Sequence, residues 1–420
     1  MSPPPATPLT SRPARSRVLP WFAAWGPGLL VMLADTDAGN VVAAAQAGAR
    51  WSYRLLPLLV LLIPLLYMVQ ELAVRLGIHT GRGHGELIRE RLGARWAWLA
   101  AAMLAIAAIG SMVTEFTAVA GIGEMHGLSR GLSLPLAATL LLAVVLTGSY
   151  RRIERAALAI GLFELAFLVV AWRAHPDLAR VASQAAHPPL DQPGFLYLGA
   201  GLIGATFNPW MIFYQQSAVA DKGLLPDDHR AARWDTATGA VLTQLLTAAV
   251  LVAAASTLGD RGVPERLQSV GEIASALSPA LGERAGRLIF SVGVLGAALV
   301  AAIVASLALT WGLGEVAGLR RSLEHRALRA PWFSGLYALC VTGSAALVWA
   351  VPDLIRLNLD MQVLNAFMLP LALGILVVLA LKALPEGQRL RGGYLWLWLA
   401  VAGATCAFAW LGAGSAGLAP

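Results

Sequence analysis

Two apolar segments of this chain, each long enough to cross a bilayer, are interrupted by polar residues. The first interruption reads Asp-Thr-Asp-Ala-Gly-Asn at residues 35–40, and the second reads Ala-Thr-Phe-Asn-Pro-Trp at residues 205–210. Carboxylates, carboxamides, Gly and Pro suit a lipid-facing helix poorly, because each polar group left unsatisfied in hydrocarbon costs several kcal/mol. Breaks of this kind indicate a binding site near the membrane midplane.

The composition places the whole chain in a membrane. Apolar residues make up 58% of the 420 residues, charged residues 13%, and the mean hydropathy is +0.67, whereas a soluble domain carries about a quarter charged residues. The apolar segments are near the ~20-residue spanning length and too long for barrel strands, so an all-α integral membrane protein is expected. We predict eleven spans, at 20–46, 54–77, 95–122, 132–149, 155–174, 194–218, 234–258, 286–314, 332–350, 358–382 and 393–412.

The charge pattern predicts an orientation. Most of the 31 Lys and Arg residues fall in segments that are cytoplasmic if the N-terminus is cytoplasmic, which is the asymmetry of the positive-inside rule. Eleven spans then put the C-terminus outside a plasma membrane. The net charge of +7 reflects this rule. The arginines are scattered through loops and form no basic stripe, so the lipid bilayer is the expected partner and nucleic acid is not.

The positions of the breaks predict an internal repeat. They fall in the first and sixth spans, five spans apart, as expected for two five-helix repeats at 20–174 and 194–382 with an eleventh helix at 393–412. Because five is odd, the second repeat would lie inverted in the membrane. Residues 1–19 are rich in Pro, Ser and Arg and are predicted to be a disordered cytoplasmic tail. Cys340 and Cys406 fall inside predicted spans, where we expect free thiols.

The residues in the two breaks predict a cation site. Gly39 permits non-helical backbone, Asp37 offers an anionic oxygen and Asn40 an amide oxygen three residues later. In the second break, Pro209 removes a backbone donor and so frees the carbonyl near Ala205, while Asn208 adds another amide oxygen. Hard divalent cations such as Mg²⁺, Ca²⁺ and Mn²⁺ prefer this all-oxygen set. The metal is expected as transported substrate, with no resident cofactor.

Other roles stay open for the single residues. One Asn in a transmembrane helix can serve as interhelical glue, and Asp37 alone can be a proton relay or a salt-bridge partner. Asp35 reaches the same cavity as Asp37 only if the helix unwinds. Gln362, with Asn365 three residues later, is either a further ligand or a packing hydrogen bond.

Three further carboxylates and two tryptophans lie in predicted spans. Glu115 is an intramembrane carboxylate, which by default marks a proton or ion route. For Glu71 a partner arginine or snorkelling to the interface is the simpler account, and Glu164 fits either role. Trp210 lines the predicted cavity, and both Trp210 and Trp311 are expected to pack rather than gate.

At these residues the chain resembles the Nramp family of divalent metal transporters. The resemblance covers nearly the whole chain and is strongest over Gly26–Gly93, including the Asp37–Asn40, Gln46–Arg50 and Arg75–Gly81 stretches; the sixth span contributes Gly204–Thr206 and Asn208–Trp210. It implies a LeuT-like fold, alternating access, and import of Mn²⁺ or Fe²⁺ with protons. By matching, Asp37, Asn40 and the Ala205 carbonyl would be metal ligands, and Gln362 aligns with a tenth-helix glutamine.

The chain also departs from the family pattern, which is Asp-Pro-Gly-Asn in the first helix and Met-Pro-His in the sixth. Ala38 replaces the Pro, and Asn208 replaces the metal-binding Met, so a hard oxygen stands in for a soft thioether. Trp210 occupies the place of the His linked to proton movement. Glu115 stands in for an Asp of the third-helix proton route, and Ala118 for its Glu. This pattern is similar to the Nramp-related magnesium transporters, which are thought to work without proton coupling.

The sequence therefore leads to the hypothesis of a secondary transporter for Mg²⁺ or Mn²⁺ without proton coupling. The first alternative is a proton-coupled Mn²⁺/Fe²⁺ importer of the ordinary Nramp type. An amino-acid or organic-solute symporter of the same fold is a weaker alternative, since such sites usually have Gly-rich breaks. The sequence shows no His cluster, nucleophile elbow or Gly-rich phosphate loop, so an enzyme is not expected.

Overall fold

The computed structural model describes residues 25–146, 150–259, 273, 283–319, 331–350 and 354–414, and within these ranges it contains helices and no strands. The predicted tail at 1–19 lies outside the described residues. The helices are α1 (Pro27–Asp35), α2 (Ala38–Trp51), α3 (Leu56–Thr80), α4 (His84–Leu92), α5 (Ala94–Met125), α6 (Arg130–Leu146), α7 (Tyr150–Gly161), η2 (Leu162–Leu165), α8 (Ala166–Arg173), α9 (Leu178–Ala185), α10 (Pro193–Thr206), α11 (Pro209–Asp221), η3 (Pro226–Asp228), α12 (His229–Leu258), α14 (Glu283–Ala317), α15 (Pro331–Ala350), α16 (Leu354–Ala383), η6 (Glu386–Gln388) and α17 (Gly392–Gly414).

Within the described residues, helices occupy most of each of the eleven predicted apolar segments. Of the described helices, eight are long and apolar enough to cross a membrane, and the bent pair of α1 and α2 makes a ninth. The other two predicted segments are helical but fall short of that standard as single helices: α6 has 17 residues, and the 155–174 segment is divided into α7, η2 and α8. Two helices were not predicted, α4 and α9. Both are short and lie in polar connections between apolar segments.

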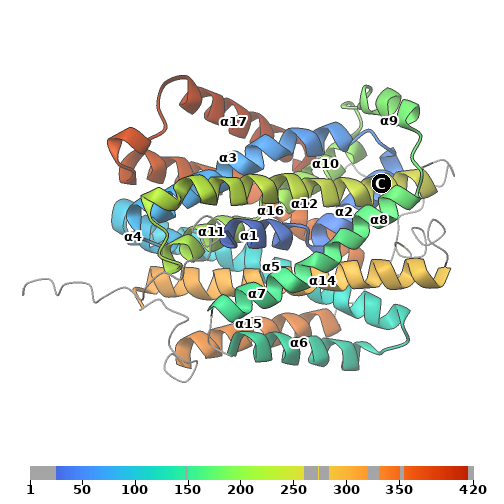
Figure 1. Ribbon diagram of the computed structural model, residues 1–420, viewed down its shortest axis with the longest axis horizontal. Coiled ribbons are helices and arrows are strands. Elements are labelled where there is room, and N and C mark those ends of the chain that lie inside the picture. Colours follow the sequence, from blue (N-terminus) through green and yellow to red (C-terminus); the bar gives the residue numbers. More distant parts are fainter. Residues whose placement is uncertain are drawn as a thin grey trace, which may run out of the picture.

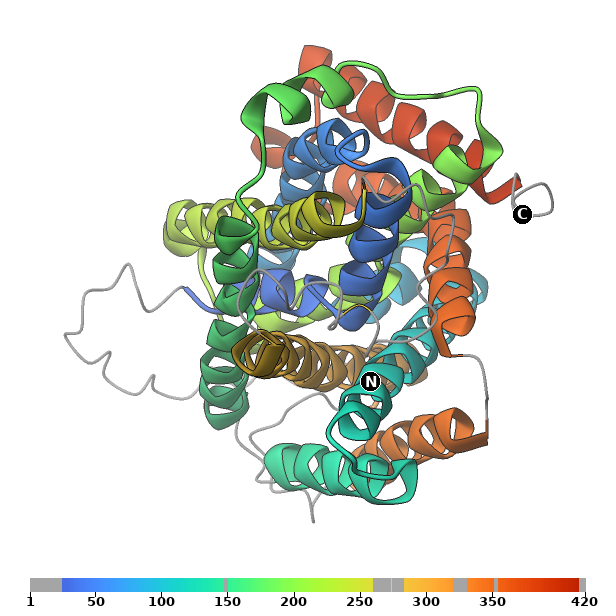
Figure 2. The same ribbon diagram turned by 90° about the vertical axis from the view of Figure 1, so that its right-hand side faces the viewer.

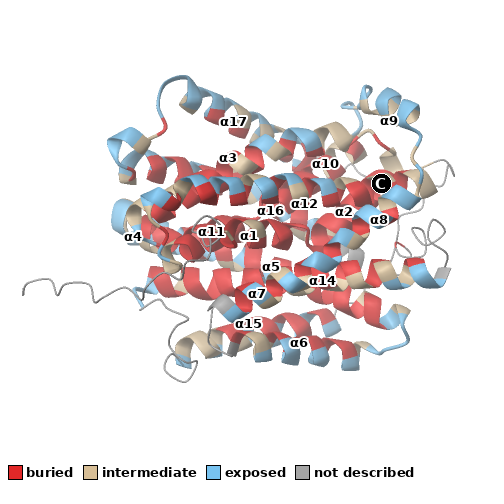
Figure 3. Ribbon diagram, in the orientation of Figure 1, coloured by how far each residue is buried: buried red, intermediate tan, exposed pale blue. Residues whose placement is uncertain are grey.

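The helices run mostly alongside one another, and the broken ones lie inside the bundle. Helix α1 contacts α12, α14 and α11, and α2 contacts α12 and α10, so both halves of the first span are enclosed (Figures 1 and 2). The burial pattern follows this order, with the central helices mostly buried and α6, α15 and α17 showing exposed faces (Figure 3). The buried centre is where a polar break can find partners.

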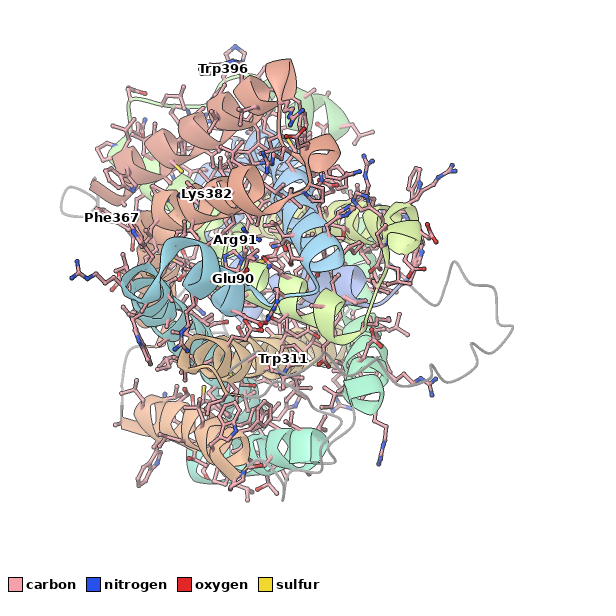
Figure 4. The ribbon with its side chains drawn as sticks, turned by 90° about the vertical axis from the view of Figure 1, so that its left-hand side faces the viewer. Glu90, Arg91, Trp311, Phe367, Lys382 and Trp396 are labelled. Carbon is pink, nitrogen blue, oxygen red and sulfur yellow. The ribbon has the colours of Figure 1, made fainter. Side chains whose placement is uncertain are left out.

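The exposed faces are apolar, as a lipid-facing surface requires. Trp396 on α17 is 72% exposed and lies at the outer edge of the molecule, whereas Trp311 on α14 lies inside it and is 3% exposed (Figure 4). Leu136 on α6 and Leu339 on α15 are also exposed by more than half. Exposed apolar patches of this extent are rare on soluble monomers, so these faces fit contact with acyl chains.

Small residues let the inner helices approach closely. The Cα of Gly48 on α2 faces the Leu251 carbonyl of α12, and Gly204 on α10 faces the Gln362 carbonyl of α16, with no room for a Cβ at either position. Such small-residue contacts are the usual way in which transmembrane helices pack without a hydrophobic driving force between them. The contact at Gly204 places the second break directly against α16.

Glu71, a carboxylate inside the α3 span, is paired with basic side chains. The Glu71 carboxylate accepts from Arg75 at 2.6 Å and lies 3.2 Å from His229 Nε2, and Arg75 also donates to the Gln388 carbonyl at 3.1 Å. A partner arginine for Glu71, one of the two accounts expected from the sequence, is therefore confirmed.

Helix α4 is anchored to the bundle by polar contacts at its first turn. The Gly85 N–H donates to the Glu315 carboxylate of α14 at 2.9 Å, and Ser217 of α11 donates to the other Glu315 oxygen at 2.7 Å. His84 Nδ1 lies 2.7 Å from Gln216 Oε1. Burial lowers the pKa of the His84 imidazole from its ordinary 6.5 to about 4, an effect opposed in part by the Gln216 contact.

This buried histidine predicts a pH dependence of stability. Between about pH 6.5 and pH 4 the unfolded chain binds a proton at His84 that the folded chain does not, so stability falls as the pH is lowered through that window. The shift corresponds to about 3 kcal/mol at its limit. We expect His84→Gln to flatten the pH dependence of the Tm in detergent. The matched control His187→Gln, at an exposed position, should show the same pH dependence of the Tm as the wild type. If the Tm of His84→Gln changed with pH as steeply as that of the wild type, the assignment to His84 would be contradicted.

Candidate functional site

The first break is an interruption between two helices that meet at an angle of 46°. Helix α1 ends at Asp35, and Asp37 is the N-cap of α2, with extended backbone angles. The Asp37 Oδ1 accepts from the Asn40 N–H at 2.7 Å, and the Asn40 side chain donates to the Asp35 carbonyl. The predicted break is present but is shorter than residues 35–40: only Thr36 and Asp37 lie between the helices, and Gly39, expected in non-helical backbone, belongs to the first turn of α2. Asp37 and Asn40 stabilise the break by capping both helix ends.

The second break separates α10 from α11 at Phe207 and Asn208. In a continuous helix the Ala205 carbonyl would accept from residue 209, but Pro209 has no N–H to donate. The Asn208 side chain donates to the Ala205 carbonyl instead, at 3.5 Å, the outer limit for a hydrogen bond. Together the two helices form one 29-residue span, Pro193–Asp221. The Ala205 carbonyl is thus held only weakly, as the sequence predicts.

Helix α16 brings the two breaks together. A side chain on Gly39 would meet the Gln362 amide first and Asp37 Oδ1 next, and Gly204 lies against the Gln362 carbonyl. Asn365, one turn further along α16, donates to Asn208 Oδ1 at 2.6 Å. The predicted site residues are all buried: Asp35, Asp37, Asn40, Ala205, Asn208, Trp210 and Gln362 are each no more than 1% exposed, and Pro209 is buried as well. The structure therefore collects them in one buried region.

Several oxygens in this region lack hydrogen-bond partners among the described residues. They are Asp35 Oδ1, Asp37 Oδ2, Asn40 Oδ1 and Glu115 Oε1. The other Glu115 oxygen accepts from the Ala38 N–H at 3.2 Å, so this carboxylate of α5 touches the start of α2. Buried oxygens without donors are costly, and a cation or protons would compensate them.

The amide groups are oriented differently from the carboxylates. The oxygens of Asn208 and Gln362 both accept from Asn365, so they face Asn365 and not the first break. No group of three or more His, Cys, Asp or Glu side chains that could hold a metal ion is found in the part of the chain that the structure describes. A cation bound here would therefore depend on amide and backbone oxygens as well as on carboxylates.

A protein-family model matches the part of the chain that contains both breaks. The model named Nramp, described as natural resistance-associated macrophage protein-like, matches residues 28–412 and so includes both breaks and α16. The chain belongs to the Nramp family.

Relatives of this Nramp chain extend over most or all of its length. It is 31% identical over 309 residues to the divalent metal cation transporter MntH of Deinococcus radiodurans, a match that covers 70% of this chain and 68% of the relative. It is 27% identical over 417 residues to MntH of Klebsiella pneumoniae, with 97% of each chain covered.

Solved structures agree on the fold. The manganese transporter of Eremococcus coleocola superposes with a TM-score of 0.73 at 19% identity, covering 95% of this chain and 88% of that one. A Na⁺-coupled sialic acid symporter superposes with a TM-score of 0.58 at 13% identity, covering 96% and 90%. The Nramp chain therefore has the LeuT-like all-α fold expected from the sequence, while the exact repeat boundaries remain a prediction.

Helix α12 supplies partners that sequence reasoning did not identify. The Thr36 hydroxyl lies 2.8 Å from the Thr243 hydroxyl, which is also 3.5 Å from the Asp35 carboxylate. Gln244 donates to Thr206 at 3.2 Å, in the second break. Polar residues recurring in the 234–258 span were the available signal, because an apolar span has no need of them. Helix α12 of the Nramp protein thus contacts both breaks.

Glu164 is a second residue whose place the sequence left open. It is fully buried and lies near Thr36, Asp35 and Asp37. It belongs to η2, a four-residue 3₁₀ segment whose other members Leu162, Phe163 and Leu165 are exposed. A 3₁₀ stretch inside a helix often marks a functional position, and here it directs one carboxylate inward while its neighbours face outward.

The start of α1 is held by Asp235 of α12 and by Lys222, which follows α11 and is paired with Glu154 of α7. The Asp235 carboxylate of α12 accepts from the N–H groups of Gly26, Gly28 and Leu29 at 3.1, 2.8 and 3.1 Å. Lys222 donates to the Trp25 carbonyl at 2.6 Å and to Glu154 of α7 at 3.0 Å. A carboxylate suits a helix N-terminus because the backbone donors there are otherwise unpaired. Since α1 has only nine residues, this clamp at its start also positions the break at its end.

We expect Asp235→Asn to destabilise the protein. Loss of a charge-assisted cap with three backbone donors costs about 1–3 kcal/mol, which should lower the Tm in detergent by a few degrees. The exposed Asp227→Asn, in η3, is the matched control. An Asp235→Asn protein with the Tm of the wild type would show that the cap contributes nothing.

Proposed function

We propose that this protein imports a hard divalent cation, Mg²⁺ or Mn²⁺, across the plasma membrane by alternating access. The observation that carries the proposal is the set of buried oxygens without partners where the two helix breaks meet. Two relatives are named divalent metal cation transporters and a structural neighbour is a manganese transporter, which supports a metal ion as substrate and transport rather than catalysis.

Each residue has a distinct role in the proposed site. Asp37 neutralises the cation, with Oδ2 available while Oδ1 holds the α2 N-terminus. Asn40 adds Oδ1, and the weakly held Ala205 carbonyl adds a backbone oxygen. Asn208 and Gln362 supply amide oxygens, and Asp35 adjusts the shell directly or through water. Gly39 leaves the space that lets Gln362 approach Asp37, while Pro209 and Trp210 form the cavity wall.

The ligand chemistry favours a hard cation. Carboxylate, amide and carbonyl oxygens suit Mg²⁺ and Mn²⁺, and Asn208 stands where the resemblance puts a thioether. Cys340 lies on α15 and Cys406 on α17, so both thiols are outside the breaks.

We further propose that transport is not coupled to protons. Trp210 and Ala118 stand where the resemblance puts proton-handling His and Glu residues, and only Glu115 is left as a carboxylate of the third-span route. The Trp210 indole is fully buried and cannot exchange a proton near neutral pH. The alternative is the proton-coupled Mn²⁺/Fe²⁺ importer, with Glu115 as its proton carrier. Orientation with a cytoplasmic N-terminus and an extracytoplasmic C-terminus belongs to the proposal and rests on the positive-inside rule.

Flux into proteoliposomes tests both parts. We expect Mg²⁺ and Mn²⁺ indicators inside the vesicles to respond to external metal, while an internal pH indicator stays constant. Acidification together with Mn²⁺ entry and no Mg²⁺ signal would establish the proton-coupled alternative. Uptake of organic solute with no metal dependence would point to a symporter and overturn the metal proposal.

We expect Asp37→Asn to reduce metal flux at least tenfold. The substitution preserves size and one amide oxygen but removes the charge that balances a divalent cation, and losses of 10–100-fold are typical when a metal site is perturbed. Asp191→Asn, exposed in the connection before α10, is the matched control and should transport as the wild type does. Normal flux through a well-folded Asp37→Asn protein would remove Asp37 from the site.

A further inference from the structure

Asn365 links the two candidate amide ligands. It lies on α16 one turn after Gln362 and is 3% exposed. Its NH₂ group donates one hydrogen bond to Asn208 Oδ1 at 2.6 Å and another to Gln362 Oε1 at 3.2 Å. An amide NH₂ carries two hydrogens, so both are used on the oxygens of the two candidate ligands. One buried side chain therefore fixes the orientation of a residue in the second break and of a residue on α16.

This arrangement turns the NH₂ groups of both ligands toward the breaks. The Asn208 NH₂ donates to the Ala205 carbonyl at 3.5 Å. The Gln362 NH₂ has no hydrogen-bond partner within the described ranges, although it is buried. It lies beside Gly39, close enough that a side chain there would meet it before Asp37 Oδ1. The amide face presented to the Asp37 turn is thus a donor face.

A divalent cation needs the opposite face. Metal ions of this class bind amide oxygen and not amide nitrogen. A half-turn about the last side-chain bond exchanges oxygen and NH₂ in Asn and Gln. If Asn208 and Gln362 both turn, their NH₂ groups point at the NH₂ group of Asn365, which places donors against donors. Asn365 must then turn as well, so that its Oδ1 accepts from both.

The hydrogen bonds among the three amides balance in this exchange. Asn365 donates two bonds in the arrangement of the structure and accepts two in the turned arrangement. The Gln362 NH₂, which is buried and unpartnered, gains an acceptor, and burial of an unsatisfied donor costs about 1–3 kcal/mol. The Asn208 NH₂ leaves the Ala205 carbonyl, which is thereby released for the cation. One concerted motion presents three oxygens to the site.

We propose that Asn365 is a positioning residue that makes Asn208 and Gln362 present oxygen to the cation together. This proposal rests on the metal-transport function proposed above. Asn365 does not touch the cation; it acts through the two amides, as an outer-shell partner acts on a metal ligand. Because the two ligands turn as a pair, the site switches between a donor face and an oxygen face.

The test is the Kd of the purified full-length protein for Mg²⁺ and for Mn²⁺, measured by calorimetry in detergent. We expect Asn365→Leu, which is similar in size and has no polar atoms, to weaken binding about 10-fold or more. Asn358→Leu, the same change one turn before Gln362 on the same helix, is the matched control and should change the Kd less than about twofold. Asn365→Ser replaces Asn365→Leu if the latter does not fold.

A second background separates positioning from general structure. In an Asn208→Ala, Gln362→Ala protein the two amides are absent, so adding Asn365→Leu should change the Kd less than about twofold. An equal loss in both backgrounds would overturn the proposal, as would an unchanged Kd in Asn365→Leu alone. If the wild type binds neither Mg²⁺ nor Mn²⁺, the proposed metal function itself fails, which is a separate result.

Side-chain amide NMR signals give a readout that does not depend on affinity. In the ¹⁵N-labelled wild type we expect the side-chain NH₂ signals of both Asn208 and Gln362 to move when Mg²⁺ saturates the site, because both amides turn. In Mg²⁺-saturated Asn365→Leu, at least one of these two signals should stay near its metal-free position. Shifts of the same size in both proteins would show that the amides turn without Asn365 and would overturn the proposal.

Discussion

The structure depends on one constraint, which is that every backbone N–H and C=O inside a bilayer needs a partner within the protein. A continuous helix would meet this need, but two spans are interrupted. The first break is closed by its own side chains, with Asp37 and Asn40 capping the helix ends. The second is closed less completely, because Pro209 leaves the Ala205 carbonyl with only a long bond from Asn208. The enclosing helices make both arrangements tolerable by excluding lipid.

The two breaks differ in formal charge. The first is bent and carries Asp35 and Asp37, with Glu115 in contact with the start of α2. The second carries amide and carbonyl groups without formal charge. Attraction of a cation therefore comes mainly from one side of the site. The second break instead sets which oxygen atoms surround the cation, because rotations of its neutral amide groups decide which atoms face the site.

The sequence was sufficient for features that are local or compositional. The two breaks follow from polar residues that no apolar span would otherwise contain, and the all-α fold follows from segment length. The partners of those residues depend on tertiary contacts and were not accessible. Nothing near Asp235 in the sequence indicates that it caps α1, more than 200 residues earlier. Likewise, the spacing of Gln362 and Asn365 shows that they share a face but not which way the amides point. Helices α4 and α9 were missed because both are short and lie in polar connections.

Gln362 is touched by the glycines of both breaks, Gly39 through its side chain and Gly204 through its carbonyl. This double contact makes α16 a common reference for two segments whose glycines, Gly39 and Gly204, are 165 residues apart in the sequence. A displacement of either segment would push against Gln362. A methyl group added at Gly39 or Gly204 would therefore move Gln362 and change its contact with the other break. The two glycines thus fix the positions of the two breaks relative to each other through Gln362. In a comparison of natural variants, positions 39, 204 and 362 should therefore change as a set or not at all.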